Sequence, residues 1–289
     1  MNRQEQITTK QNEAPMLECQ YASRFYFNRA EKLSAFAFGA AAISVLSIFL
    51  PEAESTQWNN ITLIVPILAD IVAAILYFSM DKAIEKAATL RNIFDAIVLQ
   101  INVQGHQSIN DRYVREIILK ALNHDKDKAS QQMNNSGRNN PPGVKNWYEF
   151  SKKYSDLEAI HECQRQNIWW DKHLSNGRLV MNIILLIGVA LILIYFKVKG
   201  ESLLRIFLCG ISFIATFFDR IANNIKYYRQ SLMLEGISKN IDLNGNLEQI
   251  EHLQEGIEAR REIPVLGINI FHRINSNKLS KSYEHITKK

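Results

Sequence analysis

The sequence predicts an all-α membrane protein with four transmembrane helices in two hairpins, extended into a helical cytoplasmic domain. Two observations lead to this fold class: long apolar runs, and helical spacing of apolar residues in the segments between and after them. The chain has 289 residues, of which 47% are hydrophobic. Each apolar run is close to the length that crosses a bilayer as a helix, and a helix satisfies its own backbone groups there. The runs are 33–50, 61–80, 179–196 and 203–218.

The runs divide the chain into five parts. A polar segment of some thirty residues precedes the first run, which is unlike the start of a secretory signal, so we expect the first run to be a retained span. The expected parts are an N-terminal cytoplasmic segment 1–32, a first hairpin 33–80, a cytoplasmic helical segment 81–178, a second hairpin 179–218 and a C-terminal cytoplasmic segment 219–289.

Basic residues flank the ends of the runs that we expect to lie in the cytoplasm. The loop 51–60 has no Lys or Arg, whereas Lys82 follows the second run, Arg178 precedes the third and Arg220 follows the fourth. By the positive-inside rule, both termini and the central segment are cytoplasmic. The short loop between the third and fourth runs is the exception, because it holds two lysines and one glutamate. Those lysines can snorkel to the interface.

The net charge and the cysteine content agree with a membrane protein whose polar segments lie mostly in the cytoplasm. The net charge of +5 follows from the positive-inside bias. It also leaves open an attraction to anionic lipid or to a phosphate-bearing ligand. Cys19, Cys163 and Cys209 form no disulfide framework, and we expect them to be reduced thiols.

The polar segments are also expected to be helical. Beyond Met80 the second span should continue as one long helix, because apolar residues recur at three- and four-residue spacing as far as Ile101. The stretch 124–143 is rich in Asn and Gln and ends in Pro-Pro-Gly, so we expect an exposed loop there. Further helices are expected at 111–122, 147–174, 219–240 and 247–261.

The sequence lacks the signatures of common enzyme classes. It contains no glycine-rich phosphate loop, HExxH, GxSxG or paired CxxC motif. We therefore expect neither enzymatic activity nor a cofactor. His161, Cys163 and His173 do not have the spacing of a zinc site, so no metal site is expected either.

Asp70 and Arg205 are charged residues inside predicted spans. An ionisable group near the middle of a span is costly and marks a functional site by default. We expect Asp70 to line a pore or gate, with Arg205 as its partner or as a snorkelling residue. The alternative is that Asp70 holds neighbouring helices together by a buried hydrogen bond.

Aromatic and polar side chains gather in the segment before the third run. Aromatic rings stack on nucleobases, and arginine pairs with phosphate. The alternative for Trp170 is an interfacial anchor just before the third span. Because the C-terminal segment is expected to pack beside the central one, its paired arginines are further candidates. The candidate ligand-binding residues are Trp147, Tyr148, Arg165, Asn167, Trp170, Arg260 and Arg261.

The chain resembles the SMODS-associated four-transmembrane effector family of bacterial CBASS anti-phage systems over nearly its whole length. The resemblance rests on the order and spacing of short motifs around the two hairpins. These motifs are Gln11-Asn12 with Met16-Leu17-Glu18, Gln20, Arg24 and Tyr26; Asn92-Ile93-Phe94-Asp95; Asn146-Trp147-Tyr148; and Cys163-Gln164-Arg165 with Asn167, Trp170 and Asp171.

The resemblance implies an effector that responds to a cyclic nucleotide and compromises the bacterial inner membrane, with both termini cytoplasmic. The expected partners are a cyclic di- or trinucleotide and the lipid bilayer, and neither DNA nor RNA. Four spans enclose no wide pore alone, so we also expect a homo-oligomer. Two alternatives stay open: a membrane-anchored scaffold or interaction module without conduction, and a small transporter.

Overall fold

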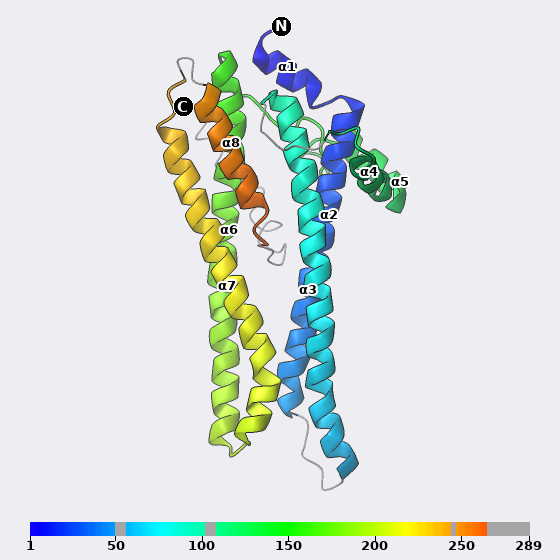
Figure 1. Ribbon diagram of the computed structural model, residues 1–289, viewed down its shortest axis with the longest axis vertical. Coiled ribbons are helices and arrows are strands. Elements are labelled where there is room, and N and C mark those ends of the chain that lie inside the picture. Colours follow the sequence, from blue (N-terminus) through cyan, green and yellow to red (C-terminus); the bar gives the residue numbers. More distant parts are fainter. Residues whose placement is uncertain (50–55, 102–107, 244–246, 265–289) are drawn as a thin grey trace.

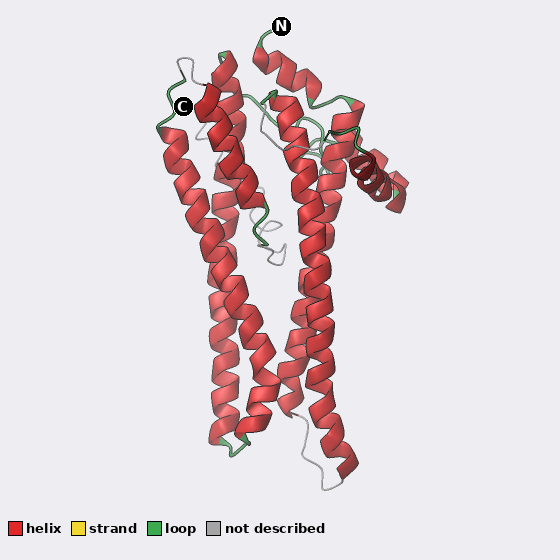
Figure 2. Cartoon of the chain, viewed as in Figure 1, coloured by secondary structure: helices red, strands yellow, loops and turns green. Residues whose placement is uncertain are grey.

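The computed structural model describes residues 1–49, 56–101, 108–243 and 247–264. These residues form helices and loops and no β-strand, as Figure 2 shows. Four long helices lie in two antiparallel pairs (Figure 1). The first pair is α2 (Ala14–Leu46), followed by the short helix η1 (Ser47–Phe49), with α3 (Thr56–Leu99); the second is α6 (Asp156–Val198) with α7 (Leu203–Lys239).

The long helices extend well beyond the apolar runs. Helix α3 has 44 residues, which corresponds to about 66 Å and is roughly twice the thickness of a bilayer's hydrocarbon core. The predicted continuation of the second span into a long helix is therefore confirmed. The second pair is joined by a tight turn at Lys199–Glu201, where Gly200 adopts a φ of +95° that favours glycine.

The shorter helices lie at the end of the molecule away from this turn, and we call that end the head (Figure 1). Helix α8 packs against α6 and α7, and its C-terminal end reaches α3. The core of the head includes Ile7, Tyr26 and Phe94, all buried. The shorter helices are α1 (Arg3–Lys10), α4 (Arg112–His124), α5 (Lys126–Asn134) and α8 (Leu247–Arg261).

Three of the described helical segments are long and apolar enough to cross a membrane: Ala14–Phe49, Ile64–Leu99 and Asp156–Val198. They contain most of the first three predicted runs. The fourth run lies in α7, several of whose side chains are outside the described residues. The helical, membrane character of the chain is thus confirmed, and the four-span arrangement stays a prediction.

Large apolar side chains on the outer faces of these helices point away from the protein. Ile71 and Phe78 on α3 and Ile184 and Leu191 on α6 are each at least half exposed. Exposed apolar surface of this extent is unusual on a soluble monomer and suits contact with lipid.

The two pairs meet along α2 and α7. Ser47 on η1 lies 3.3 Å from the Cys209 sulfur of α7. Further along α7, the guanidinium of Arg220 donates to the backbone carbonyl and hydroxyl of Ser34, at 2.9 and 2.7 Å, and lies over the ring of Tyr77 on α3. Small residues on α2 and η1 therefore bring the pairs together, and Arg220 joins three helices near the C-terminal end of the fourth run.

Two local expectations are wrong. The stretch 124–143 is not all loop, because α5 occupies part of it. Its first turn is capped by Asp125, which accepts a hydrogen bond from the Lys128 amide at 3.0 Å. The helix expected at 147–174 begins only at Asp156, where Ser155 and Glu158 form a capping box. The residues before Asp156 form a loop instead.

Candidate ligand-binding site

The buried carboxylate of Asp95 is the centre of a polar network in the head. Asp95 lies 15 residues beyond Met80, about 22 Å along α3. The Tyr148 hydroxyl donates to its Oδ1 at 2.6 Å, and Arg261 donates to its Oδ2. The Arg91 Nε lies 3.6 Å from Oδ1. Three segments far apart in sequence thus share one carboxylate.

Both members of the central ion pair stay charged at neutral pH. Burial alone raises the pKa of a carboxyl group, but the charges of Arg261 and Arg91 and the hydrogen bonds of Tyr148 and Arg261 hold the pKa of Asp95 below its usual range. Burial lowers the pKa of Arg261, and the charge of Asp95 outweighs that effect. Burial and the neighbouring Asp95 raise the pKa of Tyr148 well above its usual value, so its hydroxyl keeps the proton it donates.

The loop that carries Tyr148 is fixed by two side chains at the end of α1. The amide of Gln11 donates to the Tyr148 carbonyl at 3.1 Å and accepts from the Tyr148 backbone N–H at 2.8 Å. The amide of Asn12 donates to the side-chain Oδ1 of Asn146 at 2.8 Å and accepts from the Asn146 backbone N–H at 3.0 Å. The φ of Asn146, +52°, is one that Asn tolerates. Two of the motifs behind the family resemblance therefore meet here and aim Tyr148 at Asp95.

Arg91 connects the network to the surface. Its guanidinium lies over the ring of Trp147, 4.2 Å from the ring centre, and donates to Asn167 at 3.2 Å. Asn167 in turn donates to the Tyr148 hydroxyl at 3.0 Å. Trp147 is 40% exposed. The arrangement offers an accessible aromatic ring backed by a cation, which is a suitable platform for a nucleobase.

A second ion pair lies beside the first. Arg260 donates to Asp171, which is one turn beyond Asn167 on α6. The Tyr227 hydroxyl of α7 is hydrogen-bonded to Asp171, and burial followed by the Asp171 charge raises its pKa to about 12. The ring of Tyr227 lies 5.5 Å from the Arg260 guanidinium. The end of α8 is thus enclosed by polar groups from α6 and α7.

The two arginines of α8 contact different helix pairs. Arg260 contacts Asp171 on α6, in the second pair, whereas Arg261 contacts Asp95 and Asn92 on α3, in the first pair. We call this double connection the α8 bridge. The body of α8 is held to the second pair by apolar contacts, with Ile257 in one buried cluster with residues of α6 and α7. The C-terminal end of α8 therefore joins the two pairs within the head.

The structure brings together most of the predicted ligand-binding residues. Trp147, Tyr148, Asn167 and Arg261 share the Asp95 network, and Arg260 lies beside it. Two others lie apart from it. Arg165 is about half exposed and pairs with Glu162 at 3.5 Å. Trp170 is half-buried and packs edge-on against Trp169, with ring centres 5.5 Å apart.

Sequence reasoning missed three members as site residues: Arg91, Asp95 and Asp171. One signal was available for the first two. Asp95 interrupts the apolar stripe of α3 between Phe94 and Ile97, and Arg91 lies four residues before it. A charged i, i+4 pair on the buried face of a helix indicates a polar partner from elsewhere in the chain.

The predicted pore residues lie in different surroundings. Asp70 is half-buried on α3, and its enclosed Oδ1 has no hydrogen-bond partner among the described residues. Arg205 is buried near the turn of the second pair, where it pairs with Glu201 at 3.1 Å and donates to the Ile48 carbonyl at 3.1 Å. Arg205 therefore helps to connect the pairs at the end opposite to the α8 bridge.

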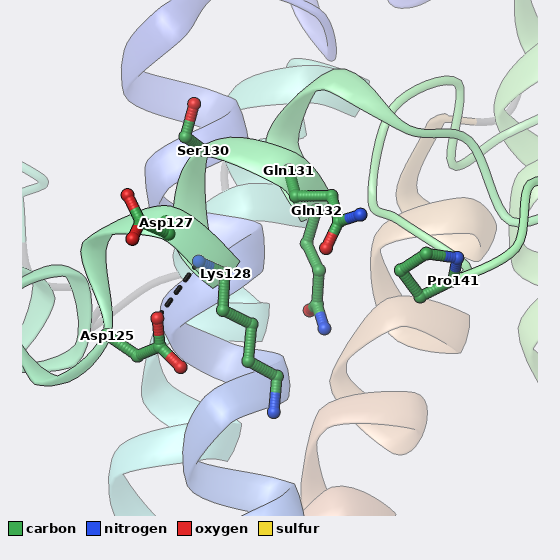
Figure 3. A pocket seen from close by; sticks show the side chains of 7 residues that line it. All are labelled: Asp125, Asp127, Lys128, Ser130, Gln131, Gln132 and Pro141. Carbon is green, nitrogen blue, oxygen red and sulfur yellow. Dashed lines mark hydrogen bonds between the residues drawn. The ribbon is translucent and has the colours of Figure 1, made fainter.

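A hollow on the surface of α5 is a weaker candidate (Figure 3). It measures about 660 Å³ and is open to solvent. Two carboxylates and one lysine line it, so its charge disfavours a phosphate ligand. The lining residues are Asp125, Asp127, Lys128, Ser130, Gln131, Gln132 and Pro141. Within the described ranges, no group of three or more His, Cys, Asp or Glu side chains is arranged to hold a metal ion.

Most of the chain matches a known protein family. Residues 5–242 match the model of a family described as the SMODS-associating 4TM effector domain. No curated protein and no solved structure matches the chain. The matched range includes Gln11, Asp95, Tyr148 and Asp171, and it ends before α8. The arginines of the α8 bridge therefore lie outside the matched domain.

Proposed function

Because this chain belongs to the SMODS-associating four-transmembrane effector family, and is thus a membrane effector associated with SMODS-type systems, we propose that a cyclic di- or trinucleotide triggers it. In this proposal the nucleotide binds the cytoplasmic head, and the protein then permeabilises the bacterial inner membrane as a homo-oligomer. The protein acts as a signal-dependent effector and not as an enzyme.

The observation that carries the proposal is the Asp95 network. It joins α3, α6, α8 and the 146–148 loop through a buried ion pair and the hydrogen bonds around it. A buried network of this kind is stable only in a narrow set of arrangements, because each unpaired charge is costly. An anion that competes for the arginines therefore favours a different arrangement of the two helix pairs. A ligand shifts such an equilibrium by its differential affinity for the two states.

Trp147 and Arg91 supply the chemistry for a nucleobase. The indole is exposed on one side and stacked on the guanidinium on the other, so a base can add to the stack without displacing a buried group. Stacking of one base on an aromatic ring contributes about 1–3 kcal/mol. Trp147→Ala should weaken nucleotide binding accordingly, and Trp147→Phe should restore part of it. Equal binding by both variants and the wild type would place the base elsewhere.

The membrane part supports permeabilisation by an assembly. Four helices in two pairs enclose no wide aqueous path in one chain, so several copies are needed. In the part of the chain that the structure describes, one carboxylate oxygen of Asp70 has no hydrogen-bond partner, and its neighbours along α3 are apolar. A charge at this depth is expected to face a helix interface or water. We propose that Asp70 faces the path that opens between copies.

The proposal is tested by calorimetric titration of the detergent-solubilised protein with a panel of cyclic di- and trinucleotides. At least one nucleotide should bind, with one molecule per chain or one molecule per symmetric pair of chains. Mass photometry of the same samples should report larger assemblies in its presence. Binding by none of the nucleotides would contradict the proposed trigger and favour a protein partner or a lipid.

A further inference from the structure

Arg260 is a fully buried guanidinium with incomplete hydrogen bonding. Its side chain has 0% exposure, and its Nη2 donates to Asp171. Among the described residues, its Nε and Nη1 meet no acceptor. Burying the N–H groups of a charged side chain without acceptors is costly, and such groups are rare in folded proteins. The position is therefore suited to an additional acceptor group.

The neighbouring Arg261 shows that burial alone does not produce this arrangement. Arg261 is also buried at the same helix end, yet its Nη1 donates to Asn92 at 3.0 Å and its Nη2 donates to Asp95. Both terminal nitrogens of Arg261 thus have a hydrogen-bond acceptor. Arg260 keeps two donor groups, Nε and Nη1, for an acceptor that the described residues do not provide.

The local charge indicates the sign of that group. In the described part of the site, the guanidinium groups of Arg91, Arg260 and Arg261 face the carboxylates of Asp95 and Asp171. Among these five groups positive charge is in excess, and the buried carboxylate of Glu258, two residues before Arg260, accepts a hydrogen bond from Gln254. An anion with several oxygen atoms fits this excess and the forked donor geometry of arginine.

Arg260 and Trp147 are linked through α6, which places an arginine near the proposed base platform. Asn167 contacts Arg91, which lies under Trp147, and Asp171 contacts Arg260. These two residues are one turn apart on α6, a rise of about 6 Å. The exposed ring and the buried arginine are thus connected through neighbouring turns of one helix.

We propose that Arg260 is the phosphate-binding residue of the nucleotide site: phosphate oxygens accept from its Nε and Nη1 and displace Asp171 from its Nη2. This inference rests on the proposed nucleotide trigger and assigns its phosphate contact. Since Arg260 is enclosed, phosphate reaches it only when the end of α8 moves away from α6. Nucleotide binding and opening of this half of the α8 bridge are then one event. The Tyr227 hydroxyl, which now contacts Asp171, is placed to contact the phosphate instead.

The test is calorimetric titration of full-length protein variants with whichever cyclic nucleotide binds the wild type. Arg260→Gln should weaken binding roughly ten- to a hundred-fold, and Arg260→Lys should restore it only in part, because lysine lacks the fork. Asp171→Asn should bind more tightly than the wild type, because the competing carboxylate is gone. If the Arg260–Asp171 ion pair had only a structural role, Arg260→Gln and Asp171→Asn should both weaken nucleotide binding. The matched control is Arg112→Gln on α4, whose arginine side chain is 93% exposed.

Three results distinguish failure of the nucleotide trigger from failure of the Arg260–phosphate contact. If no nucleotide binds the wild type, the proposed trigger fails, and this inference fails with it. If a nucleotide binds the wild type and Arg260→Gln equally, this inference alone is overturned. If Arg260→Gln does not fold, Asp171→Asn decides, and binding no tighter than that of the wild type overturns the inference. Hydrogen exchange adds a second readout: amides at 256–261 should exchange faster with nucleotide bound, and unchanged exchange contradicts the movement of α8.

Discussion

Arg261 at the end of α8 and Asp95 on α3 form a buried ion pair between residues 166 positions apart in the chain. Tyr148 and Arg91 share the same carboxylate, so the pair belongs to a hydrogen-bonded network and not to an isolated contact. Together with Arg260 and Asp171, it links the two helix pairs in the head. The packing of α2 against α7 links them at the membrane end.

Breaking this ion pair from one side should destabilise the head. Removing one partner of a buried pair leaves the other charge uncompensated, at a cost of about 3–5 kcal/mol. Arg261→Gln and Asp95→Asn should therefore each lower the thermal midpoint in detergent by several degrees. The double variant should be less destabilised than the sum of the single variants. Strict additivity would show that the two residues are not coupled.

Stability should fall as the pH drops below about 6.5 because of His161. Its Nε2 lies 2.8 Å from the Ser238 hydroxyl and joins α6 to α7. Burial, followed by the charge of Arg165, lowers the pKa of His161. The unfolded chain takes up the proton first, near pH 6.5, so the stabilisation is complete above that value and is lost as the pH falls through the lower pKa of the folded state.

The measurement is thermal unfolding followed by tryptophan fluorescence across this pH range. His161→Gln, which stays neutral, should show a flatter dependence than the wild type. Equal slopes in the two proteins would assign the pH dependence to other groups.

Asp70→Asn should change ion flux through the assembled protein without changing its assembly. Asp70→Leu should change the flux more, because an apolar side chain also removes the polar lining. Flux is measured in proteoliposomes, and assembly by mass photometry. If both variants instead reduce expression or oligomer yield, Asp70 holds helices together and does not line the path.

The orientation of the chain is a separate prediction. Basic residues flank the inner ends of all four runs, so both termini and the central segment should be cytoplasmic. A membrane-impermeant thiol reagent on intact cells should label a cysteine introduced at position 55 and spare one at position 135. The three native cysteines are buried, which keeps the background low. The opposite labelling pattern would reverse the topology.

The sequence was informative about helices and less so about the site, for physical reasons. Apolar periodicity is local, so the continuous α3 and the exact extent of α8 could be predicted from it. The helix α5 escaped prediction because its stretch is rich in Asn and Gln, and its burial of Ala129 depends on packing against α2.

Only some of the site residues could be predicted from the sequence, because their role depends on contacts between distant segments. Tyr148, Asn167 and Arg261 were predicted from residue type, but Asp95, to which two of them donate, was not. Arg165 was among the predicted ligand-binding residues, whereas the structure places it on the exposed face of α6, paired with Glu162. Residue type alone does not tell which face of a helix will be covered by α8.

The central claim is that a nucleotide bound in the head opens a path through the membrane. It is tested most directly by release of a trapped dye or ion from proteoliposomes that contain the purified protein. The account predicts release only when the added cyclic nucleotide is one that binds in calorimetric titration, and at concentrations close to its dissociation constant. Tight binding without release, or the same release without any nucleotide, would contradict the claim.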